Sequence, residues 1–378
     1  MKKQFQILLV TGIFLLTGCT RTDSGAKSED SVQYAGCMPL TYAEQFSVDY
    51  CTDGCSVIHI GNESFLLVPE AGSIPKTNDM PVLQQPLSNL YVAASSAMDL
   101  IDAAGGLNQV RLTSTDRKEW SLPNIQDAFD REDLTFIGKY SAPDYEALTE
   151  TDCDLTVEST MILHTPAVKE QIEAMGIPVL TERSSYEPHP LGRLEWIKLY
   201  GLLLGKYEQA EAFFKEKEAE FLSLNQPNLP EDQRLTCAFF SINANHAVTI
   251  RKPGDYISKM IGLAGGSYIF TAEQLHTDET ALSTMTIQME TFYETAKDAD
   301  ILIYNSTIEG PLGSIEQLVS KNKLFQDFSA VKNDRVWCTE QNLFQQTTGT
   351  ADMMKDLNLI FTDSSPETEQ LTYLRRIH

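Results

Sequence analysis

The richest group of chemically capable side chains lies in RSSYEPHPLGR, residues 183–193. Arg183 can form paired hydrogen bonds with a carboxylate, a phenolate or a phosphate. Tyr186 and His189 can coordinate Fe(III) or hydrogen-bond to an organic chelate. The two prolines restrict the backbone and would hold such a group in a fixed geometry. The alternative is that Glu187 pairs with an arginine of the same stretch, so that these residues only stiffen the chain.

A second basic group follows in SINANHAVTIRKPGDY, residues 241–256. It contains His246, Arg251 and Lys252. If these side chains lie across a cleft from Arg183, they form a cationic pocket in an otherwise acidic protein. Such a pocket suits an anionic iron chelate. The alternative is that Arg251 and Lys252 are solvated loop charges.

Further polar side chains follow short runs of strand-forming residues. Ligands bind beyond the carboxyl ends of the strands in open α/β sheets, so these residues are expected to line one site. The candidate ligand-binding residues of this kind are Ser95, Ser96, Tyr140, Thr160, His164, Ser185, Asn243 and Asn305. Trp120 and Tyr140 are candidate walls for a planar ligand, because flat aromatic rings suit macrocycles and catecholates.

The elements that must position these residues alternate between strand and helix patterns. NLYVAAS, residues 89–95, precedes a helical segment that ends in two glycines, and LTCAFFSIN, residues 235–243, begins a second series of the same kind. This alternation predicts parallel strands with crossover helices. Between the two series, apolar residues recur at helical spacing to about Leu224, which predicts one helix on the order of 45–50 Å long. The expected fold is therefore α/β, with two lobes joined by one long linking helix.

Residues 46–68 alternate between apolar and polar and contain turn signals, which predicts a β-hairpin appendage of two or three antiparallel strands. The expected order along the chain is a signal peptide at 1–18, a tether at 19–45, the β appendage and its connector at 46–85, the first α/β lobe at 86–188, the linking helix at 189–225 and the second α/β lobe at 226–378.

The N-terminus has the pattern of a bacterial lipoprotein signal. Two lysines precede an apolar run that is too short to span a bilayer comfortably, and LTGC ends at Cys19. We expect Cys19 to be lipidated, by palmitate among other acyl chains, and to hold the protein on the outer face of the cell membrane. The alternative is an ordinary secretory signal with an incidental cysteine.

The composition excludes several classes of function. The formal net charge of −24 argues against nucleic acid as a partner. The sequence contains no zinc-type cysteine and histidine spacing and no recognised catalytic motif, so we expect no metal site, no cofactor and no enzyme activity. Cys51 and Cys55 flank a predicted three-residue hairpin loop and are candidates for a disulfide; two reduced thiols are the equal alternative.

The chain resembles the helical-backbone class of ABC-importer substrate-binding proteins, the family that captures ferric siderophores, haem and cobalamin. The resemblance lies in NLYVAASSAMDLIDAAGG, IGKYSAPDYEALTETDCDLTVES, GDYISKMIGLAGG and AVKNDRVWCTE, in this order along the chain. It implies two lobes with a ligand cleft between them, and an ABC permease with its ATPase as partners. It also implies that Glu146 and Glu290 dock the permease, one from each lobe. The alternative is that both are ordinary solvated glutamates.

These observations predict a lipid-anchored solute-binding protein, expected to be monomeric, that captures an iron complex such as a ferric siderophore. The Fe(III) would belong to the ligand rather than to the protein. A cobamide or haem receptor of the same class is the nearest alternative. From other classes, a lipid-anchored two-lobed enzyme or an adhesin remains open.

Overall fold

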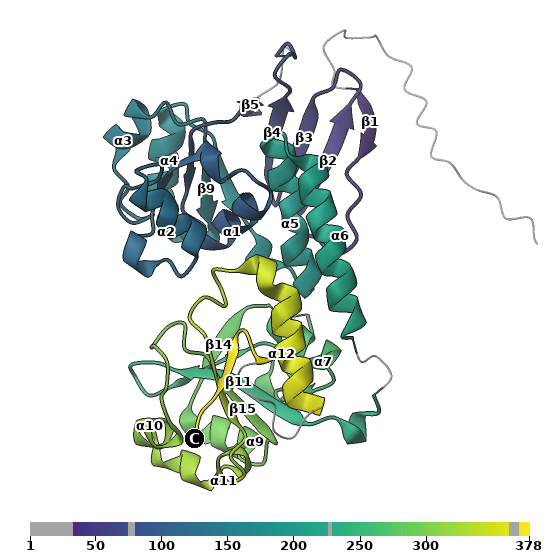
Figure 1. Ribbon diagram of the computed structural model, residues 1–378, viewed down its shortest axis with the longest axis vertical. Helices are drawn as coiled ribbons and strands as arrows, with labels where there is room; N and C mark the ends of the chain where they lie inside the picture. The colour runs from purple at the N-terminus through teal and green to yellow at the C-terminus, as the bar shows by residue number, and fades with distance from the viewer. Residues whose placement is uncertain (1–32, 75–79, 226–228, 281, 363–369) are drawn as a thin grey trace, which may run out of the picture.

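The computed structural model describes residues 33–74, 80–225, 229–280, 282–362 and 370–378. Figure 1 shows two lobes, one above the other, with a further β-sheet beside the upper lobe. A pair of helices lies next to this sheet and extends to the lower lobe. The expected signal peptide and Cys19 lie outside the described residues. Within the described residues, no helix has the length and apolar character needed to cross a membrane.

The N-terminal sheet has the strand order β1-β2-β3-β4-β5 and is antiparallel except for the β4–β5 pair. Its strands are β1 (Tyr34–Cys37), β2 (Phe46–Cys51), β3 (Ser56–Ile60), β4 (Glu63–Val68) and β5 (Val82–Gln84). A β appendage is present as predicted, but it has five strands rather than two or three antiparallel ones. The prediction of a tether up to residue 45 is wrong from Tyr34 onward, because β1 and the segment after it belong to the folded structure.

The turn between β2 and β3 has the expected form, with Gly54 at a φ of +87°. The amide of Cys51 donates to the carbonyl of Cys55 at 2.9 Å, so the two cysteines face each other across the turn. Both thiols are buried and free, and burial raises the pKa of Cys55 to about 11. The possible disulfide is thus not formed in this structure.

The first lobe is a parallel sheet of order β10-β9-β6-β7-β8 between helices. Its strands are β6 (Leu90–Val92), β7 (Val110–Thr113), β8 (Thr135–Phe136), β9 (Leu155–Ser159) and β10 (Val179–Glu182). Its helices are α1 (Ser95–Ala103), α2 (Pro123–Asp130), α3 (Tyr145–Glu150) and α4 (Pro166–Ala174), with the short 3-10 helices η1 (Leu107–Gln109), η2 (Arg117–Glu119), η3 (Thr160–His164) and η4 (Ser184–Tyr186).

The second lobe has the sheet order β14-β12-β11-β15-β16-β17, and β13 also pairs with β11. Its strands are β11 (Thr236–Ile242), β12 (Val248–Arg251), β13 (Ser267–Tyr268), β14 (Thr284–Ile287), β15 (Ile301–Tyr304), β16 (Val336–Thr339) and β17 (Leu374–Arg376). Its helices are α7 (Tyr256–Leu263), α8 (Ala272–Leu275), α9 (Met289–Ala296), α10 (Ile315–Lys321), α11 (Ser329–Lys332) and α12 (Thr350–Thr362), with η5 (Glu231–Gln233), η6 (Lys323–Asp327) and η7 (Thr347–Gly349). Two α/β lobes are therefore confirmed.

The helical connection between the lobes differs from the single long helix that the sequence predicted. It consists of α5 (Pro190–Leu203) and α6 (Tyr207–Ser223), which lie side by side as a hairpin (Figure 1). Gly205 has a φ of +68°, and the amide of Lys206 returns to the carbonyl of Gly201, which ends α5. The two helices pack closely at Gly201, which has no side chain. A Cβ at this position would lie only 2.4 Å from the Cβ of Ala210.

One hydrophobic cluster runs through all three parts of the molecule. It includes Phe46 of the N-terminal sheet, Ile101 of the first lobe, Trp196 of α5 and Met354 of the second lobe. The second lobe has an additional aromatic cluster around Phe240. The lobes and the N-terminal sheet are therefore packed as one body around α5.

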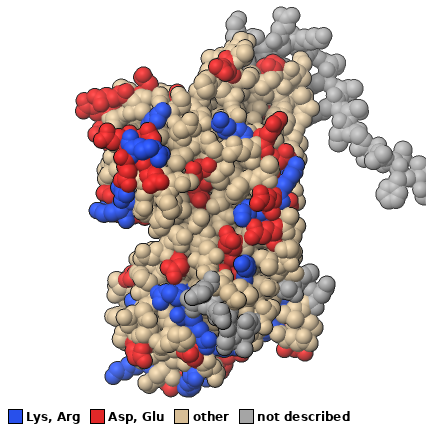
Figure 2. Space-filling view, viewed as in Figure 1, with Lys and Arg blue, Asp and Glu red and all other residues tan. Residues whose placement is uncertain are grey.

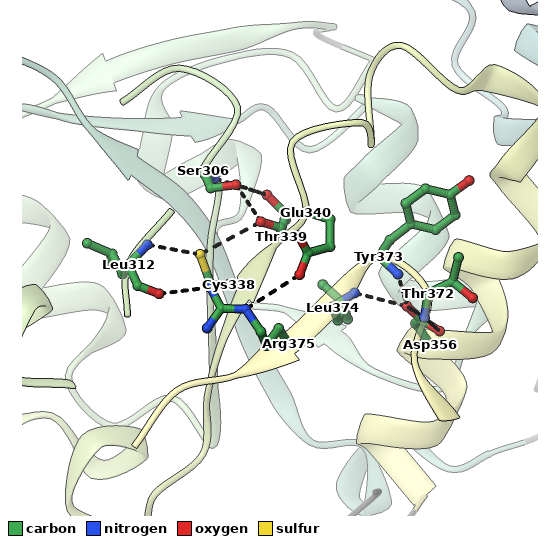
Figure 3. Close-up of polar contacts among 10 residues, drawn as sticks. All are labelled: Ser306, Leu312, Cys338, Thr339, Glu340, Asp356, Thr372, Tyr373, Leu374 and Arg375. Atoms are coloured by element: carbon green, nitrogen blue, oxygen red, sulfur yellow. Dashed lines mark hydrogen bonds and ion pairs between the residues drawn. The ribbon is translucent and has the colours of Figure 1, made fainter. Parts of the chain in front are cut away.

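A polar network fixes the C-terminal strand of the second lobe (Figure 3). The buried carboxylate of Asp356 in α12 accepts the backbone amides of Thr372, Tyr373 and Leu374 at 2.6–3.1 Å. Beside it, the guanidinium of Arg375 donates to the carbonyl of Leu312 at 3.0 Å. These contacts tie the start of β17 to α12 and its Arg375 side chain to the loop before α10.

Candidate ligand-binding cleft

A cleft of about 430 Å³ lies between the two lobes, and Figure 2 shows the outline of the molecule indented between them. Its lining comes from α1, η3, η4 and α5 on one side and from β12, α7 and two loops of the second lobe on the other. The lining residues are Ser96, Thr160, Met161, His164, Ser185, Tyr186, Arg193, Arg251, Asp255, Tyr256, Ser283 and Phe344. The carboxyl ends of β9, β10 and β12 lead directly into these segments, as expected for an α/β sheet.

Several residues that the sequence singled out do line this cleft. They are Ser96, Thr160, His164, Ser185, Tyr186 and Arg251. Ser95 begins α1 beside Ser96 but is not part of the lining. A role of the lining residues in ligand binding stays a prediction.

Two guanidinium groups meet at the floor of the cleft, over the ring of Tyr256. The Cζ atom of Arg193 lies 4.1 Å from the ring centroid and that of Arg251 lies 5.9 Å from it. Arg251 also lies over Phe344, at 4.8 Å, and its Nη1 is 3.5 Å from a carboxylate oxygen of Asp255. The cleft floor is therefore cationic, aromatic and largely shielded from water.

Arg193 interacts with the carboxylates of Glu182 and Asp255 only at longer range. Its side chain is 7% exposed, and within the described residues its Nε has no hydrogen-bond partner and its guanidinium no ion pair within 4.0 Å. A buried guanidinium without a close ion pair is costly, and an anionic ligand would relieve that cost. Burial raises the pKa of Asp255, against the opposing effect of Arg251.

The sequence missed Met161, Arg193, Asp255, Tyr256, Ser283 and Phe344 as lining residues. Arg193 stands within the apolar pattern of α5, where the sequence suggests only an ion-pair partner for Glu187. Asp255 and Tyr256 begin α7, and Asp255 caps it by accepting the amide of Ile257. A helix start directly after a predicted strand end was the available signal for these two residues.

Arg183 and His189 do not line the cleft, so their predicted positions are wrong. The Nε of Arg183 donates to the side chain of Gln45 at 3.3 Å, on the side of the N-terminal sheet. The ring of His189 stacks on Tyr42 at 4.8 Å, and its Nδ1 accepts the amide of Leu191. Burial lowers the pKa of His189 to about 4. Both side chains point away from the cleft because residues 41–45 occupy the opposite side of this stretch.

The predicted aromatic walls of the first lobe are also wrong. Trp120 is buried in the core, 2% exposed, and its indole N–H donates to the carbonyl of Thr115. Tyr140 lies in the loop after β8 and outside the lining. The aromatic walls are instead Tyr186, Tyr256 and Phe344.

In the second lobe, the loop after β11 turns away from the cleft. Asn243 closes this turn by accepting the amides of Asn245 and Ala247, and His246 lies at its exposed tip with a φ of +61°. Asn305 is buried and accepts the amide and hydroxyl of Thr307. Lys252 is outside the lining as well. The predicted ligand contacts of Asn243, His246, Asn305 and Lys252 therefore have no support from the geometry of the cleft.

The back of the cleft is bridged by residues 345–348 of the second lobe. The side chain of Gln345 accepts the amide of Ser121 at 2.9 Å and donates to the carbonyl of Glu119 at 2.7 Å. The carboxylate of Asp99 in α1 accepts the amide of Thr348 at 2.7 Å. Because Phe344 precedes this bridge, one short segment both lines the cleft and joins the lobes.

Glu146 and Glu290 occupy the same position within their helices, one helix on each lobe. Each is exposed, and each is the second residue of a helix, α3 and α9 respectively.

No group of three or more histidine, cysteine, aspartate or glutamate side chains in the described part of the chain is arranged to hold a metal ion. Neither Ser95 nor Ser185 is hydrogen-bonded to a histidine among the described residues.

The chain belongs to the periplasmic binding protein family, whose pattern it matches over residues 92–343. It is similar to an uncharacterized lipoprotein of Methanocaldococcus jannaschii, with 24% identity over 371 residues and 91% of each chain covered. Among solved structures, it is similar to a periplasmic haem-binding protein from Pseudomonas aeruginosa at 16% identity and a TM-score of 0.58, covering 77% of this chain and 99% of that one. The catecholate-siderophore binding protein VctP from Vibrio cholerae has 15% identity and a TM-score of 0.54, with 73% and 94% covered.

Proposed function

We propose that this protein is a lipid-anchored receptor that binds an anionic iron chelate in the cleft and delivers it to an ABC permease. The observation that carries the proposal is the pair of guanidinium groups, from α5 and from the end of β12, that share the ring of Tyr256. In a shielded site, two such groups favour a ligand with carboxylate or phenolate oxygens.

The other lining residues fit the same ligand class. Ser96, Thr160 and Ser185 supply hydroxyl groups, and Tyr186 and Phe344 supply flat apolar surface. The solved proteins of similar fold include a haem-binding and a catecholate-siderophore binding protein. Both ligands combine flat rings with anionic oxygen groups, which suit the aromatic and cationic lining of the cleft.

Delivery and anchoring rest on the ends and the outer faces of the molecule. Exposed Glu146 and Glu290, one on each lobe, are the proposed contacts with the permease. The lipoprotein pattern that ends at Cys19, together with the name of the archaeal relative, supports an anchor on the outer face of the cell membrane. We propose that the receptor works as a monomer and catalyses no reaction.

Haem is the second candidate ligand, and a specific observation favours it. Tyr186 and His164 both line the cleft, and phenolate and imidazole groups are iron ligands. In that case the iron of haem would be contacted by the protein, whereas a chelate that saturates its iron would need only the arginines.

The test is a calorimetric titration of the purified protein with a ferric tris-catecholate complex, haemin and cobinamide. We expect saturable binding of the tris-catecholate complex. Substituting Arg193→Met or Arg251→Met should weaken it by about 10- to 100-fold, the cost of one charge-assisted hydrogen bond. Arg131→Met is the matched control, because Arg131 is exposed and its ion pair among the described residues is with Asp133. Binding that is unaffected by both cleft substitutions would contradict the assignment of the site.

A further inference from the structure

The polar crowding between β10 and α5 is explained by the N-terminal sheet rather than by the ligand. Residues 41–45 connect β1 to β2 and lie against this stretch. The buried carboxylate of Glu195 accepts the amides of Thr41, Tyr42 and Ala43 at 2.8–3.1 Å. The ammonium group of Lys198 lies 2.8 Å from the same carboxylate.

A second buried carboxylate makes the same kind of contact and belongs to Glu187, which directly follows the cleft residue Tyr186. Glu187, 1% exposed, accepts the amide of Glu44 at 2.8 Å and that of Gln45 at 3.0 Å. It also accepts the indole N–H of Trp196 at 2.8 Å. Carboxylates that accept several N–H groups are held in one orientation, so Glu187 has a fixed position relative to residues 41–45.

Gln45 also contacts Arg183, which lies at the start of the turn η4. Its side-chain oxygen accepts the Nε–H of Arg183 at 3.3 Å, and the side chain of Arg183 runs beside Gly61 of the N-terminal sheet. The Cζ atom of Arg183 lies 5.2 Å from the ring centroid of Tyr186. Contacts from the N-terminal sheet therefore reach both sides of η4.

The turn η4 carries two residues of the cleft lining, Ser185 and Tyr186. It is short and closed by two hydrogen bonds, from the amide of Tyr186 to Arg183 and from that of Glu187 to Ser184. A turn of this length has little stability of its own. Its conformation is fixed from outside the turn. The carboxylate of Glu182 accepts the amide of Ser184 at 2.9 Å, and the residues at the two ends of the turn are those that the N-terminal sheet contacts.

We propose that residues 41–45 of the N-terminal sheet are a positioning segment for the cleft, and that they preorganise Ser185 and Tyr186 for the ligand. The inference rests on the proposed function for its ligand but not for its structural step. Binding is tighter when the contact residues are already ordered, because less conformational entropy is lost. The N-terminal sheet thereby contributes to affinity although it does not line the cleft.

The central experiment is Gln45→Ala, which removes the side chain between the sheet and Arg183 and leaves the backbone amide bound to Glu187. Gln84→Ala is the matched control, because Gln84 belongs to β5, is exposed and bonds to the carbonyls of Pro69 and Gln85. The first readout is hydrogen–deuterium exchange at the amides of Tyr186 and Glu187, which needs no ligand. We expect exchange about 10-fold faster in Gln45→Ala and unchanged in Gln84→Ala.

The second readout is the affinity for the ferric tris-catecholate complex and for haemin, measured beside the melting temperature. We expect Kd to rise about 5- to 10-fold in Gln45→Ala with little change in melting temperature. Arg183→Met should raise Kd by a similar factor. The double variant should bind no more weakly than either single variant, because both substitutions remove the same hydrogen bond between Arg183 and Gln45.

The outcomes separate this inference from the proposed function. If the unaltered protein binds neither probe, the ligand assignment fails, and the exchange rates still decide whether residues 41–45 order η4. If the probes bind and Gln45→Ala changes neither exchange nor affinity, the positioning segment is refuted. A loss of affinity accompanied by an equal loss in Gln84→Ala would also refute it, because the effect would then not be specific to η4.

Discussion

Glu158, on β9, gives the sharpest prediction of stability. Its side chain is 0% exposed, and neither carboxylate oxygen has a hydrogen-bond partner among the described residues. Burial in this environment disfavours the charged form and raises the pKa of Glu158 from 4.5 to about 8. The folded protein therefore holds the proton more tightly than the unfolded chain does.

The sign of the pH dependence follows from this difference. The contribution of Glu158 to stability is complete below about pH 4.5 and is lost as the pH rises towards 8. With roughly 1.4 kcal/mol for each pKa unit, the loss between pH 5 and pH 8 amounts to about 3–4 kcal/mol. Glu158→Gln keeps the shape of the neutral acid and removes this dependence.

The assay is urea unfolding of the unaltered protein and of Glu158→Gln at several pH values from 5 to 8. The difference in unfolding free energy between the two should change by about 3–4 kcal/mol in favour of the variant as the pH rises. Glu150→Gln, at an exposed glutamate of α3, should show no such trend. A difference that stays constant within about 1 kcal/mol would mean that the Glu158 carboxylate is solvated or paired when charged, and would refute the reasoning.

Three further predictions concern packing, lobe contacts and transport. Gly201→Ala should lower the unfolding free energy by about 1–3 kcal/mol in urea titrations, because the new methyl group would collide with Ala210; an unchanged value would contradict the close approach of α5 and α6. Gln345→Ala should leave the fold intact and increase hydrogen exchange at the amide of Ser121, which donates to the side chain of Gln345 in the unaltered protein. Equal exchange in the variant and the unaltered protein would show that this bridge does not hold the lobes together. Glu146→Lys and Glu290→Lys should keep ligand affinity and abolish uptake in cells that carry the permease, whereas full uptake by both variants would refute the docking sites.

The two-lobed fold was predictable because its signals are local. Buried β-rich runs, helix ends marked by glycines and the alternation of the two all appear in the sequence itself. The break between α5 and α6 was missed since the apolar periodicity continues through Gly205, and only the left-handed conformation of that glycine reveals the end of α5. Periodicity alone does not distinguish one long helix from a tight helical hairpin.

The cleft was predictable only in part, because its side chains are oriented by contacts between distant segments. Tyr186 and Arg251 were predicted from the chemistry of two polar stretches, and both line the cleft. Arg183 and His189 have equally suitable chemistry, but they face Gln45 and Tyr42, which precede them by 138 and 147 positions. Nothing in the sequence around residues 41–45 indicated that this segment folds back onto α5.

The same long separation has a consequence for the order in which the protein can fold. The amides of residues 41–45 are satisfied by carboxylates that come 142 to 154 positions later in the chain. The N-terminal sheet is synthesised first, but its inner apolar face has no partner until α5 exists. Contacts of such separation form late, and unpaired apolar sheets aggregate. A nascent or cleaved chain that ends before α5 will therefore be a substrate for chaperones and proteases rather than a smaller stable domain.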